Sequence, residues 1–277
     1  MTDRGPGDHS GGVAENVQVL STLKRGLDVL ELLARSDQDL PAKRIARELG
    51  IKQPTTYHLL RTLRATGHVS RLAGGAFVLG PRSAALARRI QQRSGPSPEL
   101  AALLTRVHMK TEETSYICGW YHGTIFLQQY ITGNHALTIR GLDVGYNGNM
   151  HARASCKAIL AYLPQEQVRL MFENVELRSL TPRTTTTYAG LVRDLAVIRA
   201  RGLAIDYEEF QEGVCCMAVP FFDCSGHPAG SFTVSLPVTR FSAKQAILKN
   251  TLTEAATIAT NLLRARETIE ESGELTG

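Results

Sequence analysis

The chain has 277 residues, of which 43% are hydrophobic and 21% are charged, and its formal net charge is +5. This length favours two domains whose cores need no disulfide or metal for stability. No apolar run reaches the roughly 18–20 residues that span a bilayer, which excludes an integral membrane protein. The first residues lack the apolar core of a signal peptide, so we expect a cytoplasmic protein whose five cysteines are reduced.

The basic residues are concentrated in the first third of the chain. Residues 1–95 carry 15 Lys and Arg against 8 Asp and Glu, a net charge of +7, whereas residues 96–277 carry 16 against 18, a net charge of −2. This asymmetry predicts a polyanion-binding N-terminal domain joined to a domain with another role. A solvated charged face is the alternative interpretation.

The first predicted element is an amphipathic helix over 20–35, which follows a polar, glycine-rich tail (1–15) that we expect to be disordered. Ser21 or Thr22 is the expected cap of this helix. Its apolar row at helical spacing consists of Leu20, Leu23, Leu27, Leu30 and Ala34.

The next elements predict a DNA-binding module. Helices over 41–49 and 54–65 are joined by a tight turn at Gly50, which is typical of a helix-turn-helix. A strand, a Gly-Gly turn and a second strand follow over 67–80 and predict a hairpin wing. Three helices and a wing in a basic segment indicate a winged helix-turn-helix domain over 16–80.

A basic linker helix is predicted over 81–97, followed by a second domain over 98–270. Hairpin-linked strands with helices around them predict an α+β domain with an antiparallel sheet. In the second domain, helices are expected over 98–113, 155–163, 164–172, 187–201 and 242–268, and strands over 115–121, 124–131, 136–140, 203–206, 214–222 and 229–236.

The segment Leu49-Gly-Ile-Lys-Gln-Pro-Thr-Thr-Tyr-His-Leu-Leu-Arg-Thr-Leu63 resembles the recognition region of the isocitrate lyase regulator (IclR) family of bacterial transcription regulators, which usually reads L-G-L-P-K-S-T-V-H-R-L-L-x-T-L. Leu79-Gly-Pro-Arg82 resembles the L-G-P-R signal that follows the wing in that family. Pro54 replaces the usual serine, and Tyr57 and His58 replace the common His-Arg pair. These departures affect the expected base preferences rather than the fold.

In a helix-turn-helix, the first residues of the third helix lie nearest the base edges in the major groove. The expected base readers are Gln53, Thr55, Thr56 and His58. The expected phosphate contacts are Lys24, Arg25, Lys52 and Arg61, and Arg71 in the wing is expected to reach the minor groove or a phosphate. We expect Tyr57 to pack within the domain. The alternatives to base reading are a solvent-facing His58 and a Gln53 that only starts the helix.

The second domain resembles the same family in several motifs, so that the resemblance covers about residues 20–268. It implies a GAF-like fold that binds small organic effectors and forms homodimers or a dimer of dimers. The motifs are His151-Ala-Arg-Ala-Ser-Cys-Lys-Ala158, Leu180-Thr-Pro-Arg-Thr184, Arg201-Gly-Leu-Ala-Ile-Asp-Tyr-Glu-Glu209, Gly213-Val-Cys-Cys-Met-Ala-Val-Pro220 and Ser231-Phe-Thr-Val-Ser235.

The resemblance also implies an effector pocket. Its expected residues are Leu137, Ala154, Ser155, Asp206, Val214, Cys216, Thr233 and Ser235. Backbone amides of Ala154 and Ser155 at a helix start suit a carboxylate, and Leu137 and Val214 would form the apolar wall. Alternatively, Thr233 and Ser235 are small packed residues, Cys216 is an inert buried thiol, and Asp206 is a turn or capping residue. Lys157 is expected on the helix surface, with contact to an anionic effector as the alternative.

These observations predict a transcription regulator, repressor or activator, that binds a palindromic DNA operator and responds to a small carboxylate or aromatic acid. A thiol-based redox sensor using Cys156, where the family usually has glycine, and Cys216 is the second hypothesis. A third is an enzyme acting on a small acid. Because no G-x-S-x-G, P-loop, H-E-x-x-H or zinc-ligand spacing is present, we expect no catalytic residues, metal or cofactor.

Overall fold

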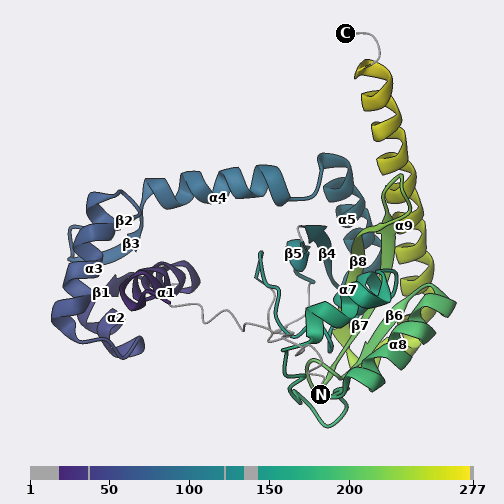
Figure 1. Cartoon of the computed structure of the whole chain (residues 1–277), viewed down its shortest axis with the longest axis horizontal. Helices are drawn as coiled ribbons and strands as arrows, with labels where there is room; N and C mark the ends of the chain where they lie inside the picture. Colours follow the sequence, from purple (N-terminus) through teal and green to yellow (C-terminus); the bar gives the residue numbers. More distant parts are fainter. Residues whose placement is uncertain (1–18, 37, 122, 134–142, 275–277) are drawn as a thin grey trace, which may run out of the picture. The chain divides into compact units, whose positions relative to one another are not determined.

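The computed structural model describes residues 19–36, 38–121, 123–133 and 143–274 (Figure 1). The chain divides into two units, one ending at Ile90 and the other beginning at Gln91. The division falls within α4 (Pro81–Ser94), inside the segment predicted as a linker. Each unit has its own hydrophobic core and is described separately.

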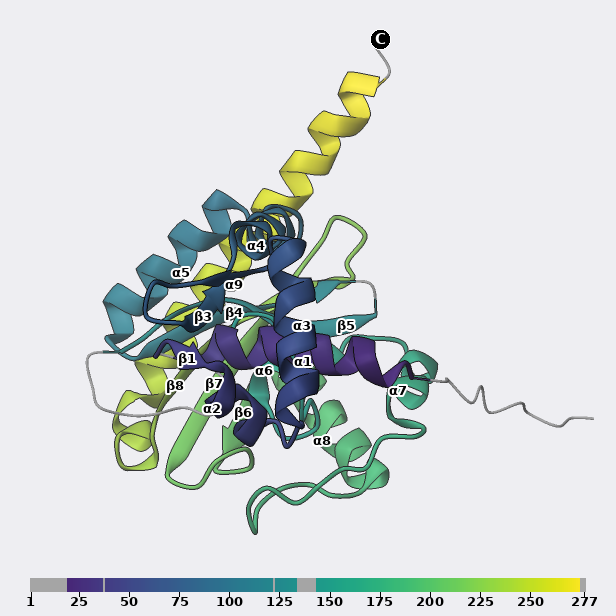
Figure 2. The same cartoon turned by 90° about the vertical axis from the view of Figure 1, so that its left-hand side faces the viewer.

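The N-terminal unit contains helices around a small antiparallel sheet, and Figure 2 shows it facing the viewer. Its elements are α1 (Ser21–Arg35), β1 (Leu40–Pro41), α2 (Ala42–Glu48), α3 (Gln53–Ala65), β2 (Val69–Arg71) and β3 (Ala76–Leu79). The strands are ordered β1-β3-β2, and β1, which the sequence did not predict, pairs Leu40 with Phe77 of the wing. Gly50 has a φ of 62° in the turn between α2 and α3, a backbone conformation that glycine adopts without strain.

The expected side-chain cap of α1 is wrong. The residue before its first turn is Leu20, and no side chain caps the helix, so Ser21 and Thr22 lie inside it. The residues of α1 that are buried in the core are Val29, Leu32 and Leu33, whereas three of the expected apolar row remain more than half exposed: Leu20, Leu23 and Leu27. With residues of α3 they line an apolar groove of about 620 Å³.

The C-terminal unit is built on an antiparallel sheet with the strand order β5-β4-β8-β7-β6 among the described residues. The strands are β4 (Thr114–Tyr121), β5 (Thr124–Ile131), β6 (Ala204–Tyr207), β7 (Val214–Phe222) and β8 (Pro228–Pro237). One face packs on α5 (Pro98–Thr111) and α9 (Val238–Glu274). The other packs on α6 (Ala154–Leu160), α7 (Gln165–Phe172) and α8 (Tyr188–Arg201).

The predicted fold class is confirmed, because a winged helix-turn-helix precedes an α+β unit with an antiparallel, GAF-like sheet. The last helix is longer than expected: α9 begins at Val238 and extends to Glu274. The strand predicted over 136–140 lies entirely outside the described residues, as does Leu137.

Polar and apolar side chains alternate along the central strand β8, so each kind lies on its own face of the sheet. In β8, Ser231, Thr233 and Ser235 lie on the face toward α6, and the apolar residues between them join the core formed with α5 and α9. The register therefore places small polar side chains on one buried face of the sheet, while the opposite face is entirely apolar along this strand.

Candidate functional site

The first residues of α3 are held at the surface of the N-terminal unit. Lys52 and Gln53 are exposed and Thr55 is half-buried, so their side chains can reach a partner in solution. The expectation for Thr56 is wrong: it is fully buried, and its hydroxyl donates to the backbone oxygen of Lys52 at 3.3 Å. A side chain held in this way cannot reach a base edge.

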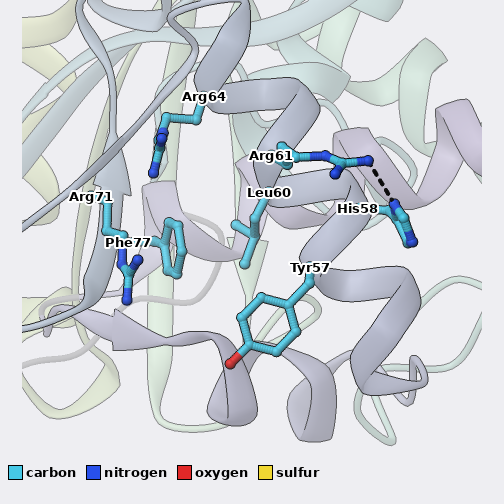
Figure 3. Close-up of a pocket in the computed structure, with 7 residues that line it drawn as sticks. All are labelled: Tyr57, His58, Leu60, Arg61, Arg64, Arg71 and Phe77. Atoms are coloured by element: carbon cyan, nitrogen blue, oxygen red, sulfur yellow. Dashed lines mark hydrogen bonds between the residues drawn. The ribbon is translucent and has the colours of Figure 1, made fainter.

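Tyr57 also differs from its expectation, because 52% of it is exposed rather than packed in the domain. It belongs to a surface pocket of about 270 Å³ (Figure 3). The side chains that line the pocket come from α3, β2 and β3, and they are Tyr57, His58, Leu60, Arg61, Arg64, Arg71 and Phe77.

Three guanidinium groups gather at this pocket, and no carboxylate is among its described lining residues. Figure 3 shows Arg64 and Arg71 beside Phe77, and Arg71 lies 5.8 Å from the centre of that ring. Arg61 lies on the other side, with its Nη2 atom 3.1 Å from Nδ1 of His58. Such a cationic and aromatic surface suits a phosphate backbone. Arg64 was not singled out from sequence, although it follows Arg61 by three residues on the same helix.

The remaining predicted phosphate contacts lie on α1. Lys24 and Arg25 are exposed, and Lys24 forms an ion pair with Asp28 at 2.9 Å. Their role at DNA stays a prediction.

In the C-terminal unit, the register brings polar side chains from four strands onto the face below α6. Thr233 lies opposite Tyr116, and Ser235 lies opposite Cys216, which itself lies opposite Asp206. We call this set the polar row, and it comprises Tyr116, Cys118, Asp206, Cys216, Ser231, Thr233 and Ser235.

Most members of the polar row bond to one another or to α6. The Ser235 hydroxyl donates to Tyr116 Oη at 3.2 Å and lies 2.9 Å from Cys216 Sγ. The Ser231 hydroxyl donates to the backbone oxygen of Ser155 at 2.9 Å. Thr233 differs from all of them among the described residues, because its hydroxyl is buried without a hydrogen-bond partner. A buried hydroxyl without a partner is unfavourable, which makes it a candidate ligand contact.

Asp206 acts as a turn residue, as the alternative interpretation expected. Its Oδ1 atom accepts from the backbone amides of Glu209 at 2.6 Å and Phe210 at 3.3 Å. Burial raises the pKa of Asp206 to about 7, although those amides oppose the shift. Contact between this carboxyl group and an effector stays a prediction.

Lys157 is not on the helix surface, so that expectation is wrong. It is 2% exposed, and its Nζ atom lies 2.6 Å from Oε1 of Glu209. The ion pair ties α6 to the loop after β6, and it leaves Glu209 Oε2 buried without a partner among the described residues. Ala154 and Ser155 begin α6 and are buried, and Val214 lies in the same core cluster as Cys216.

The thiols of the redox hypothesis lack the usual features of reactive cysteines. Cys156 and Cys216 are buried, and burial raises the pKa of each thiol above its ordinary value. Reactive thiols need the opposite, a lowered pKa and access to solvent. The structure therefore gives this hypothesis no support.

The described ranges contain neither a metal-ligand cluster nor a membrane-spanning helix. No three His, Cys, Asp or Glu side chains gather there as metal ligands would. No helix in the same ranges has both the length and the apolar character of a membrane span.

Family models match both units of the chain. The bacterial transcriptional regulator IclR C-terminal model matches residues 99–262, and the IclR helix-turn-helix domain model matches residues 22–73. The HTH-type transcriptional regulator BhcR of Paracoccus denitrificans is 34% identical over 91% of this chain and 90% of its own. The transcriptional repressor IclR of Escherichia coli is 27% identical over 80% of this chain and 82% of its own.

Solved structures share the fold over nearly the whole chain. The Thermotoga maritima IclR structure has a TM-score of 0.74 and 25% identity, covering 89% of this chain and all of its own. An IclR homologue from Microbacterium hydrocarbonoxydans, complexed with 4-hydroxybenzoate, has a TM-score of 0.71 and 22% identity over 88% of this chain and all of its own. The protein therefore belongs to the IclR family of transcriptional regulators and has a helix-turn-helix DNA-binding domain and a C-terminal effector domain.

Proposed function

We propose that the protein controls transcription by binding a palindromic operator as a homo-oligomer, and that a small organic acid bound at the polar row changes its operator affinity. The observation that carries the effector site is the polar row itself, where Thr233 lies buried with its hydroxyl unsatisfied. A few polar groups that converge within an apolar surrounding are typical of a small-molecule site.

At the operator, α3 enters the major groove with Gln53, Thr55 and His58 at the base edges. Lys52, Arg61, Arg64 and Arg71 hold phosphates, supported by the three guanidinium groups at the pocket of Figure 3. Thr56 does not contact the bases in this proposal, because its side chain is buried.

A homodimer or dimer of dimers would match a palindromic operator, since each recognition helix reads one half-site. The exposed apolar residues of α1 support an interface between copies, because single soluble domains rarely leave a contiguous apolar patch in water. In this arrangement residues 16–80 bind DNA, residues 81–97 link the domains, and residues 98–270 bind the effector and associate.

Ligand binding would bias the spacing of the two DNA-binding domains, with a coupling free energy of roughly 1–3 kcal/mol, which corresponds to a change in operator affinity of about 5–150-fold. The regulator would act in the cytoplasm and release its ligand chemically unchanged.

The experiment is to select operator DNA from a random library with the full chain and then measure operator affinity by fluorescence anisotropy. Small carboxylates and aromatic acids are added, with 4-hydroxybenzoate as the first probe. We expect one chemical class to shift affinity at least several-fold and to be recovered intact by NMR. An affinity that no acid changes at saturating concentration would contradict effector control, and turnover of a bound acid would favour the enzyme hypothesis.

A further inference from the structure

Arg153, the residue before α6, carries a guanidinium group buried in the C-terminal unit. The side chain is 5% exposed. Its Nη1 atom donates to the backbone oxygen of Gly148 at 3.5 Å, and Nη2 donates to Cys118 Sγ at 3.7 Å. The first of these exceeds the common N–H···O distance of about 2.9 Å, and sulfur is a weak acceptor. The ring of Tyr146 lies against the guanidinium group, 4.8 Å from Cζ to the ring centre.

Other buried charged residues of this unit have a partner of opposite charge, which Arg153 lacks among the described residues. Lys157 has Glu209 at 2.6 Å, and the buried carboxylate of Glu113 has Arg240 at 2.7 Å and Lys244 at 2.9 Å. Among the described residues, no carboxylate pairs with Arg153. The internal segment 134–142, which the structure leaves undescribed, contains no Asp or Glu in its sequence. Taking a charge out of water without a counter-ion is strongly unfavourable.

The groups around Arg153 are also neutral at physiological pH. Burial raises the pKa of Cys118 to about 11 and raises the pKa of Tyr116 and of Cys156, so none of them supplies a negative charge there. Arginine keeps its proton at any such pH. The site therefore holds a positive charge that no described group within it balances.

The unbalanced charge lies beside the polar row. Cys118, which accepts from Arg153, is opposite Ser231 in the sheet, and Tyr116 is opposite Thr233. On this face of the sheet, the pair that contains Thr233 is therefore next to the pair that contains Cys118, which the guanidinium group contacts. The Thr233 hydroxyl has no hydrogen-bond partner. A single small molecule could both balance the charge of Arg153 and form a hydrogen bond with the Thr233 hydroxyl.

We propose that Arg153 determines ligand specificity by pairing its guanidinium group with the carboxylate of the effector, while the Thr233 hydroxyl bonds a polar group of the same molecule. This proposal rests on the proposed function, since it names the residue that selects an acid at the polar row. Tyr146 holds the plane of the guanidinium group, so its outer N–H groups can take a carboxylate in a two-bond contact.

The test compares each acid with its neutral amide on the full chain by isothermal titration calorimetry. The probes are 4-hydroxybenzoate and 4-hydroxybenzamide, benzoate and benzamide, succinate and succinamide, with formate as the smallest carboxylate. Wild-type protein should bind the best acid at least about 30-fold more tightly than its amide. Arg153→Gln should abolish that preference by weakening acid binding about 30-fold or more, with amide binding unchanged. Arg153→Lys, which keeps the charge but loses the planar fork, should lie between them.

Two controls separate recognition from folding. Arg193→Gln removes the same charge from the exposed face of α8 and should leave all affinities unchanged. The unliganded Arg153→Gln protein should melt at the same temperature as wild type or higher, because it no longer buries an unbalanced charge. A role in holding Gly148 would instead lower the melting temperature of both Arg153 variants, and that result would overturn the proposal.

The proposal also fails if Arg153→Gln binds acids as tightly as wild type, or if no carboxylate binds wild type even at high concentration. These failures are distinct from failure of the proposed function. If neutral ligands alter operator binding while acids do not bind, effector control stands and the role of Arg153 is overturned. If acids bind through Arg153 but operator affinity never changes, the assignment of Arg153 stands and effector control is overturned.

Discussion

The two units hold their functional groups in opposite ways. At the pocket of the N-terminal unit, cationic side chains of α3 and β2 stand at the surface, where a polyanion can reach them. In the C-terminal unit, polar and charged groups lie beneath a helix and are buried almost completely. A DNA-binding surface uses many similar charges, each of which contributes a small part of the binding free energy. A small-molecule site instead uses a few polar groups that folding has already removed from water.

The first prediction tests how strongly the C-terminal site depends on its buried charges. Lys157→Met removes the partner of Glu209 and leaves a carboxylate buried alone, so the free energy of unfolding should fall by about 3–5 kcal/mol. Chemical denaturation measures it. Lys157→Met combined with Glu209→Met should recover much of the loss. Equal losses in the single and double variants would show that the pair itself carries the stability.

The second prediction uses the buried carboxyl group of Asp206. Its pKa is raised from 3.8 to about 7 by burial, so between these pH values the folded protein keeps a proton that the unfolded chain releases. The free energy of unfolding of wild type should therefore fall as pH rises from about 4 to 7, by on the order of a few kcal/mol, and level off above 7. Asp206→Asn should lose that component, so its stability relative to wild type should increase across the window. Glu212→Gln, an exposed control, should follow wild type.

The third prediction concerns the polymer surface. Replacing Arg61, Arg64 and Arg71 together with Gln should weaken binding to every DNA sequence by about 100-fold at low salt. The slope of log affinity against log salt should become shallower by about three, or about one for Arg61→Gln alone. Anisotropy titrations over a salt series measure both quantities. A slope unchanged from wild type would remove these residues from the phosphate contacts, and ligand binding by the C-terminal unit should be unaffected throughout.

The smallest expected effect separates two adjacent threonines. Thr55→Val should change discrimination at one operator position by about 1 kcal/mol while leaving stability near normal. Thr56→Val should lower stability by about 1 kcal/mol, because its buried hydroxyl bonds Lys52, and should leave base discrimination intact. The reverse pattern would mean that Thr56 turns outward when DNA binds.

These threonines also show how far sequence reasoning reaches. Helical spacing and turn residues predicted α3 and the wing, because those signals are local. They did not set the rotation of α3 finely enough to tell Thr55 from Thr56, since one position on a helix turns a side chain by about 100°. The two-residue strand β1 was missed because its only strong signal is its pairing with Phe77.

In the C-terminal unit the alternation of Thr233 and Ser235 with apolar residues was visible in the sequence, and so was their shared face. The buried ion pair was not, because Lys157 and Glu209 are 52 positions apart and meet only when α6 packs on the sheet. Arg153 was passed over for a related reason. In sequence it is an ordinary arginine between two alanines, and its lack of a partner is apparent only when its surroundings are known.

Arg153 stands outside both the strands and α6, and this position has an evolutionary consequence. With the proposed role of Arg153, the charge of the accepted ligand is set by a residue that lies outside the strands and helices of the effector domain. After gene duplication, a single codon change at position 153 can redirect a copy from anionic to neutral metabolites while its core and its operator remain as they were. A regulator that responds to a new class of ligand can then arise without variants that fail to fold.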